Sequence, residues 1–123
     1  MRKVIGIGET ILDIIFKNEQ PTAAKPGGST FNSMITLGRL GVNTEFISEV
    51  GRDRLGKQIK DFLAENNVKS ENVYDYDGGK TALSLAFLDE NMNADYLFYK
   101  NDAAQKLDYV KTKKEKNNII VNS

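Results

Sequence analysis

Residues 26–41 have the sequence PGGSTFNSMITLGRLG, in which a turn with two glycines leads directly into an amphipathic pattern. Four residues recur there at the spacing of one helix face: Phe31, Met34, Ile35 and Gly38. Ser29 or Thr30 is expected to cap the helix at its start, and Gly41 is expected to end it as a C′ glycine. The segment therefore predicts a glycine turn followed directly by a helix.

The segments on either side of this helix alternate between strand and helix patterns. Residues 4–8 form a short apolar run that ends in glycine, which is typical of a buried parallel strand, and residues 44–50 are expected to form a second strand. A second helix is expected between its N-cap, Asp53, and residues 66–67, which stop it. Its apolar stripe consists of Leu55, Ile59, Phe62 and Leu63. The alternation predicts an α/β fold, with a Rossmann-like parallel sheet and flanking helices.

A small β-sheet lid is expected beside the parallel sheet. Residues 81–100 contain two stretches rich in β-formers around a polar loop, which predicts a hairpin. Residues 11–25 begin with an apolar run that contains Asp13 and continue as a polar loop or a weak edge strand. The lid strands should therefore lie near residues 11–25 and 81–100.

Two segments follow the lid. Residues 106–116 are rich in lysine and predict a helix or a loop. Their charges are interpreted as a solvated face, because the chain is neutral and aromatic residues do not interleave with the lysines. Residues 118–121 predict a last apolar strand.

The composition excludes several classes of function. Seventeen basic and seventeen acidic side chains cancel, so no overall field favours nucleic acid or an anionic membrane. The absence of cysteine and histidine removes disulfides, thiolate metal sites and the usual acid/base of neutral pH. No stretch approaches the roughly 18 apolar residues of a membrane span, and the N-terminal apolar run is too short for a signal peptide. A cytoplasmic protein without membrane or nucleic-acid partners is expected.

Gly27 and Gly28 give the strongest local indication of a ligand site. Two glycines let the backbone approach a ligand closely, and the following helix offers free N–H groups and the positive end of its dipole. Asn32 in the first turn has an amide that can donate to and accept from a diol. A plain loop-to-helix junction with a solvated Asn32 fits these residues equally well.

Two charged residues in the expected lid are further candidates. Asp13 lies within an apolar strand, where a carboxylate needs a partner or water. It is interpreted as an acceptor for ligand hydroxyls, with an exposed strand edge as the alternative. Lys100 could meet a ligand oxygen or be a solvated edge lysine. Residues 6–8, Gly-Ile-Gly, lack the third glycine and the helix of a dinucleotide fingerprint and are interpreted as close packing.

Taken in order, these motifs resemble the N-terminal part of a ribokinase-like (PfkB) sugar kinase of the fructokinase branch. The resemblance is carried by residues 5–9 with Asp13, by Gly27 and Gly28 with Asn32, by Leu37-Gly38-Arg39-Leu40-Gly41, by Val50-Gly51-Arg52-Asp53 with Leu55-Gly56, by Lys80-Thr81-Ala82-Leu83 and by Phe98-Tyr99-Lys100. It covers nearly the whole chain, so residues 1–123 are expected to be the N-terminal part of a sugar kinase domain.

The resemblance implies a ribokinase-like fold whose lid closes over the sugar. It implies that Asp13 and Asn32 hold sugar hydroxyls, while Gly27 and Gly28 approach the sugar through their backbone. Residues near Phe98 and Lys100 would cover the sugar, and lid sheets would pair between subunits of a homodimer. The implied reaction moves a phosphoryl group from ATP, with Mg²⁺, to a hydroxyl of fructose or a related ketose.

The family's downstream segment, a glycine-rich stretch that ends in the catalytic aspartate, has no match in residues 1–123. The resemblance therefore implies that this chain holds no catalytic residue, no metal site and no nucleotide site of its own, and that it is inactive alone. Two other hypotheses are a non-catalytic small-molecule binding module and an interaction fragment whose lid strands pair with another chain.

Overall fold

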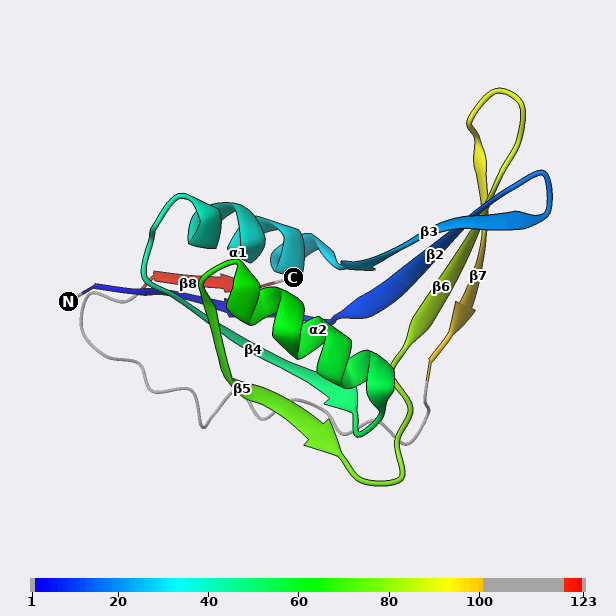
Figure 1. Cartoon of the computed structure of the whole chain (residues 1–123). Coiled ribbons are helices and arrows are strands. Elements are labelled where there is room, and N and C mark those ends of the chain that lie inside the picture. The colour runs from blue at the N-terminus through cyan, green and yellow to red at the C-terminus, as the bar shows by residue number, and fades with distance from the viewer. Residues whose placement is uncertain (1, 101–118, 123) are drawn as a thin grey trace.

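The computed structural model describes residues 2–100 and 119–122, and its strands form two sheets (Figure 1). The first sheet is parallel, in the order β5-β4-β1-β8. Its strands are β1 (Val4–Ile7), β4 (Thr44–Gly51), β5 (Val68–Tyr76) and β8 (Ile119–Asn122). The predicted helix or loop over residues 106–116 lies outside the described residues.

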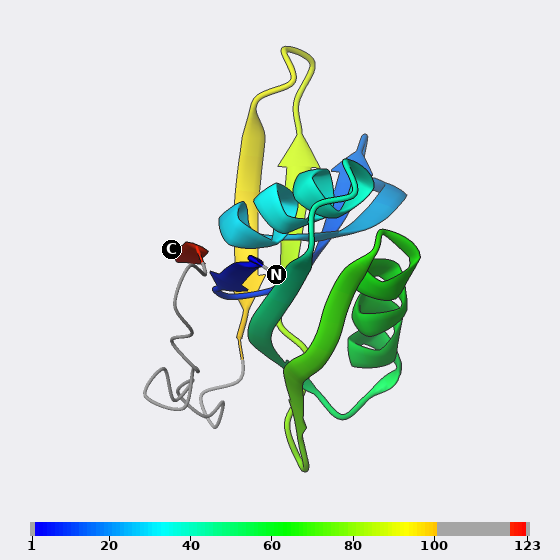
Figure 2. The same ribbon diagram turned by 90° about the vertical axis from the view of Figure 1, so that its left-hand side faces the viewer.

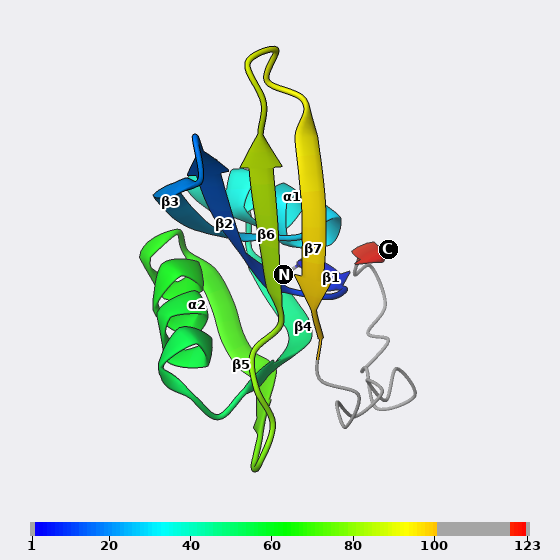
Figure 3. The ribbon, with the colours of Figure 1, turned by 90° about the vertical axis from the view of Figure 1, so that its right-hand side faces the viewer.

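The second sheet is the lid, in the order β3-β2-β6-β7. Its strands are β2 (Ile11–Lys17), β3 (Gln20–Gly27), β6 (Leu83–Leu88) and β7 (Ala94–Tyr99). β2 pairs in parallel with β6, while β3 and β7 pair antiparallel with their neighbours and form the edges. Figure 3 shows β6 and β7 side by side in this lid, and Figure 1 shows the lid beyond the end of the parallel sheet. The predicted α/β fold with a small β-sheet lid is confirmed.

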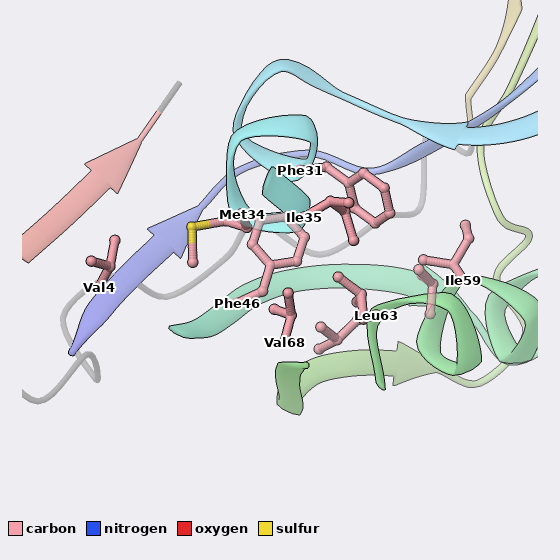
Figure 4. Packing of buried hydrophobic residues seen from close by; sticks show 10 residues of the cluster. Val4, Phe31, Met34, Ile35, Phe46, Ile59, Leu63 and Val68 are labelled. Atoms are coloured by element: carbon pink, nitrogen blue, oxygen red, sulfur yellow. The ribbon is translucent and has the colours of Figure 1, made fainter. Parts of the chain in front are cut away.

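Two helices cover one face of the parallel sheet (Figure 2). They are α1 (Ser29–Arg39) and α2 (Arg54–Glu65). Their apolar faces meet the strands in one core of buried side chains (Figure 4): Val4, Phe31, Met34, Ile35, Phe46, Val50, Ile59, Leu63, Val68 and Val73. The opposite face of the sheet carries a second cluster, of Ile5, Ile7 and Ile47. Burial of both faces explains why β1 is a continuous apolar run.

The glycines after β1 serve close packing. A Cβ at Gly6 would lie 2.5 Å from the Met34 side chain, so the missing side chain lets α1 approach the sheet. The sequence after Gly8 enters strand β2, whereas a dinucleotide fingerprint requires a helix there. The interpretation of this motif as close packing is therefore confirmed.

The start of α1 differs from the expectation. The N-cap is Gly28, with φ 132° and no capping side chain, so neither Ser29 nor Thr30 has that role. The extended backbone continues through β3 to Gly27, and the helix begins at the next residue after Gly28. Gly41, with φ 82°, follows the C-cap as predicted.

Of the two structures expected after β2, a loop or a weak edge strand, the chain forms the edge strand β3. Its two prolines are acceptable there because an edge strand pairs on one side only. Strand β5 was not predicted. Its pairing with β4 contains a bulge, so Val68 and Val73, five residues apart, are both buried in the core. The bulge removes the regular alternation that normally identifies a strand.

Candidate functional site

Asp13 and Gly27 lie against each other on adjacent lid strands. Asp13 is in β2, and Gly27 is the last residue of β3. A Cβ added to Gly27 would overlap Oδ2 of Asp13. Gly27 also pairs with Ile11, which places it on the same face of the sheet as Asp13. The structure thus brings together two of the predicted site residues through a contact that only glycine permits.

Gly28 follows Gly27 and is the N-cap of α1. A Cβ at Gly28 would lie 2.5 Å from the backbone oxygen of Glu9, and its φ of 132° is a conformation that other residues rarely adopt. The first N–H groups of a helix have no partner within the helix and lie at the positive end of its dipole. Because no side chain caps α1, these donors remain available to an oxygen-rich ligand.

An ion pair between Lys100 and Glu9 joins the end of the lid to the loop between β1 and β2. Lys100 Nζ lies 3.3 Å from Glu9 Oε2, and both side chains are mostly exposed. An exposed pair of this kind contributes about 0–1 kcal/mol, so Lys100 can leave Glu9 for a ligand oxygen at little cost. Burial and the nearby Glu9 carboxylate raise the pKa of Glu49 above its ordinary value. Negative charge therefore gathers near Glu9, a residue that the sequence had not singled out as part of the site.

A row of four side chains crosses the lid sheet at the level of Asp13. Asp13 pairs with Lys25 of β3 on one side and with Ser84 of β6 on the other, and Ser84 pairs with Phe98 of β7. Residues directly opposite each other in a sheet share a face. We call Lys25, Asp13, Ser84 and Phe98 the lid row. Phe98 is 61% exposed and stacks on Tyr96, so the row ends in an accessible aromatic surface.

Asn32 lies apart from this row. It is exposed on α1 and lines a groove of about 1050 Å³ between α1, α2 and β3, together with Lys25 and Pro26. In the part of the chain that the structure describes, no hydrogen bond joins its side chain to Asp13. The predicted partnership of Asn32 with Asp13 therefore stays a prediction.

Burial raises the pKa of Asp13 above its ordinary value of 3.8, and the neighbouring Ser84 hydroxyl opposes part of that rise. When it is ionised, Asp13 accepts hydrogen bonds. An acceptor carboxylate, free backbone N–H groups, an exposed ammonium and an aromatic face are the groups that bind a polyhydroxylated molecule. Among the described residues, no group of three or more carboxylates is placed to hold a metal ion.

Little in the sequence points to Ser84, because single serines are common within apolar strands. Its place in the lid row follows from the pairing of β2 with β6, which links residues 71 positions apart (84 minus 13).

No helix in the described part of the chain is long and apolar enough to cross a membrane.

Comparison with known proteins shows a family match over nearly the whole chain. Residues 1–121 match the family described as pfkB family carbohydrate kinase. Fructokinase-1 of Zea mays is 30% identical over 111 residues, which cover 85% of this chain and 34% of that protein. Probable fructokinase-6, chloroplastic, of Arabidopsis thaliana is also 30% identical over 111 residues, covering 85% of this chain and 29% of that protein.

Solved structures show the same fold. A sugar kinase from Pyrococcus horikoshii matches with a TM-score of 0.71 and 25% identity, over 78% of this chain and 33% of that one. Fructokinase with bound ATP from Xylella fastidiosa matches with a TM-score of 0.69 and 25% identity, over 81% of this chain and 34% of that one. The chain thus spans about a third of the length of these relatives.

Proposed function

The chain belongs to the pfkB family of carbohydrate kinases, and from this premise we propose that it forms the sugar-binding and lid portion of a fructokinase-like kinase. The observation that carries the proposal is the contact between Gly27 and Asp13. It places a carboxylate beside the backbone of a glycine, just before the N-cap of α1. The relatives named fructokinase support fructose or a related ketose as the sugar.

Each candidate residue has a role in this proposal. Asp13 accepts hydrogen bonds from sugar hydroxyls, and Gly27 and Gly28 let the sugar reach the first-turn N–H groups. Phe98 covers the apolar face of the sugar, and Lys100 donates to a sugar oxygen after leaving Glu9.

Asn32 is proposed to reach the sugar from α1. Its amide is exposed in the first turn of the helix and, in the described part of the chain, makes no side-chain hydrogen bond that would have to be broken. Lid closure toward α1 would bring Asp13 and Asn32 to the same ligand.

In the complete kinase, the bond between the β- and γ-phosphoryl groups of ATP breaks, and the sugar hydroxyl forms the new P–O bond and gives up its proton to a base. ATP and Mg²⁺ supply the phosphoryl group and neutralise its charge. The described residues of this chain bind and orient the sugar and exclude water from it. The glycine-rich segment that ends in the base aspartate has no counterpart in residues 1–123. We therefore propose that the 123-residue chain alone does not phosphorylate sugar.

Calorimetric titration of fructose into the protein and into Asp13→Asn tests the sugar site. The substitution removes the negative charge while it keeps the shape of the side chain, so fructose should bind about tenfold more weakly or worse. Asp77→Asn, at an exposed position, is the matched control and should bind like the unaltered protein. Equal fructose affinity of all three proteins would contradict the proposed site. ATP-dependent phosphorylation of fructose by the purified 123-residue chain would contradict the proposed inactivity.

A homodimer through the lid is the second part of the proposal. Every residue of β7 is exposed, including Tyr96, Leu97 and Tyr99, and among the described strands β7 lies at an edge of the lid sheet with β6 as its one neighbour. Such an edge favours pairing with a second chain. Light scattering should show a dimer that Leu97→Lys disrupts. A monomer at all concentrations tested would contradict it.

A further inference from the structure

Ser84 has a hydroxyl that the fold buries without a partner. The residue is 1% exposed, and within residues 2–100 and 119–122 its Oγ is the buried side-chain oxygen that lacks a hydrogen-bond partner. Other buried hydroxyls are paired: Ser48 Oγ donates to the Gly8 oxygen at 2.6 Å and lies 2.9 Å from Thr10 Oγ1. An unpaired buried hydroxyl costs about 1–3 kcal/mol, so its presence calls for a reason.

The position of Ser84 in the lid row supplies that reason. It lies between Asp13 on β2 and Phe98 on β7, with all three on one face of the sheet. The Asp13 carboxylate is the acidic group in the row, and it can only accept hydrogen bonds when ionised. Ser84 is therefore a buried donor without a partner at normal hydrogen-bond geometry, placed directly beside the acceptor Asp13.

The electrostatics agree with this pairing. Burial raises the pKa of Asp13, and the Ser84 hydroxyl is the neighbour that lowers it. The two groups thus lie close enough for the Ser84 hydroxyl to lower the pKa of Asp13, although in the described part of the chain its Oγ makes no hydrogen bond of normal geometry.

We propose that Ser84 is a positioning residue for Asp13, whose hydroxyl donates to the carboxylate and holds it ionised and directed at a sugar hydroxyl. The inference rests on the proposed function of Asp13. A bound sugar displaces water from the outer side of the carboxylate, so an inner donor becomes more important at the moment of binding. Ser84 itself does not need to touch the sugar.

The charged residue that pairs with Asp13 in the sheet is Lys25 of β3. Other charged side chains on the surrounding elements are Glu9, in the connection after β1, and Lys100, which follows β7 and pairs with Glu9. Glu49 of β4 interacts with Glu9 in turn. β6 contributes no charged side chain, since its sequence is LSLAFL. Replacing Ser84 with alanine leaves all these charges in place, so a change in the titration of Asp13 would report the hydroxyl.

The test is the pH dependence of fructose binding, measured by calorimetry from about pH 4 to pH 8. Fructose should bind more weakly toward acid as Asp13 takes up a proton; we call this part of the pH profile the acid limb. In Ser84→Ala the acid limb should move to higher pH. Fructose should also bind about three- to tenfold more weakly to this variant at neutral pH, as expected for one lost hydrogen bond. Ser84→Thr keeps the hydroxyl and should restore the position of the acid limb.

Ser48→Ala is the matched control, because it removes a buried hydroxyl that is fully paired. It should lower the unfolding temperature and leave the acid limb unchanged. If Ser84→Ala does not fold, Ser84→Cys, which keeps the volume but donates weakly, replaces it with the same expectation. An acid limb in the alanine or cysteine variant that coincides with that of the unaltered protein would overturn the inference.

The outcome for Asp13→Asn separates this inference from the proposed function. If that variant binds fructose as well as the unaltered protein, the sugar site itself is wrong. If it binds weakly while the Ser84 variants keep the original acid limb, only the role of Ser84 is wrong.

Discussion

Thr81 and Asp53 are joined by two hydrogen bonds, from Thr81 N to Asp53 Oδ2 at 2.8 Å and from Thr81 Oγ1 to Asp53 Oδ1 at 2.7 Å. Asp53 also accepts from Gly56 N at 2.8 Å as the predicted N-cap of α2, and Gly51 N donates to Thr81 Oγ1 at 3.1 Å. The two side chains therefore tie the end of β4 and the start of α2 to the chain that enters the lid strand β6.

Thr81→Val tests how much this connection contributes to stability. Valine keeps the shape of threonine but leaves Gly51 N without its partner and removes one of the two donors to Asp53 Oδ1. We expect the free energy of unfolding in urea to fall by about 1–3 kcal/mol. Thr36→Val on the exposed face of α1 is the control and should cost less than about 0.5 kcal/mol. Equal losses for both variants would show that the connection contributes nothing specific.

The stability of the protein should depend on pH through Asp53. Burial works to raise the pKa of Asp53, but hydrogen bonds from Thr81, Gly56 and Leu55 together outweigh it and hold the pKa below its ordinary value of 3.8. Because the folded pKa is the lower one, the unfolded chain binds more protons in acid. The contribution of Asp53 is therefore complete above about pH 5 and is lost as the pH falls through 3.8 toward the folded pKa.

This dependence is measured as the difference in unfolding free energy between the protein and Asp53→Asn at a series of pH values. This difference in unfolding free energy should be constant near neutral pH and should become smaller in acid. Thr81→Val removes one of the donors to Asp53, so the loss of the difference in acid should be smaller when both proteins carry that substitution. A difference that stays constant down to about pH 3 would contradict the assigned hydrogen bonds.

Gly38→Ala should destabilise the protein, although alanine is the better helix former by about 1 kcal/mol. A Cβ at Gly38 would overlap the Asn66 oxygen and lie 2.8 Å from the Val68 side chain, so α1 would have to move away from the connection between α2 and β5. We expect a net loss of about 1–3 kcal/mol in the free energy of unfolding. Ser33→Ala, at an exposed position of the same helix, should be neutral or stabilising. A gain in stability for Gly38→Ala would contradict the packing.

The sequence predicted most of this fold because its helices and central strands obey simple periodicities. Asp53 could be identified as an N-cap, and Gly41 as a C′ residue, from their neighbours alone. Strand β5 could not be found, because the bulge that buries both Val68 and Val73 depends on pairing with β4 rather than on local sequence. The Gly28 cap was missed for a related reason, since the path of β3 determines where α1 begins.

The candidate site was predictable only in part. Gly27 and Asp13 carry recognisable chemistry in their own segments, and the fold places them in contact. Ser84 and Glu9 carry no such signal, because their relevance arises from neighbours distant in sequence: Asp13 for Ser84, and Lys100 for Glu9. Long-range strand pairing, which one sequence does not reveal, is the missing information.

Gly27→Ala gives the sharpest test of the sugar site. The backbone of Gly27 does not have a positive φ, so alanine is acceptable to the chain itself. Its Cβ would, however, occupy the place of Asp13 Oδ2 and force the carboxylate to turn away. We therefore expect a folded protein that binds fructose at least about tenfold more weakly in calorimetric titrations. Gly28→Ala should instead unfold the protein or strongly destabilise it, because its φ of 132° and the Glu9 oxygen both oppose a side chain.

The double variant with Asp13→Asn shows whether Gly27→Ala acts through the carboxylate. If displacement of Asp13 is the whole cause, Gly27→Ala should weaken fructose binding in the unaltered protein and have little further effect once Asp13 is asparagine. Losses that simply add would mean that Gly27 contacts the sugar independently of Asp13. Unchanged binding in Gly27→Ala would mean that the sugar lies elsewhere, since a displaced carboxylate cannot keep its hydrogen bonds to a bound sugar.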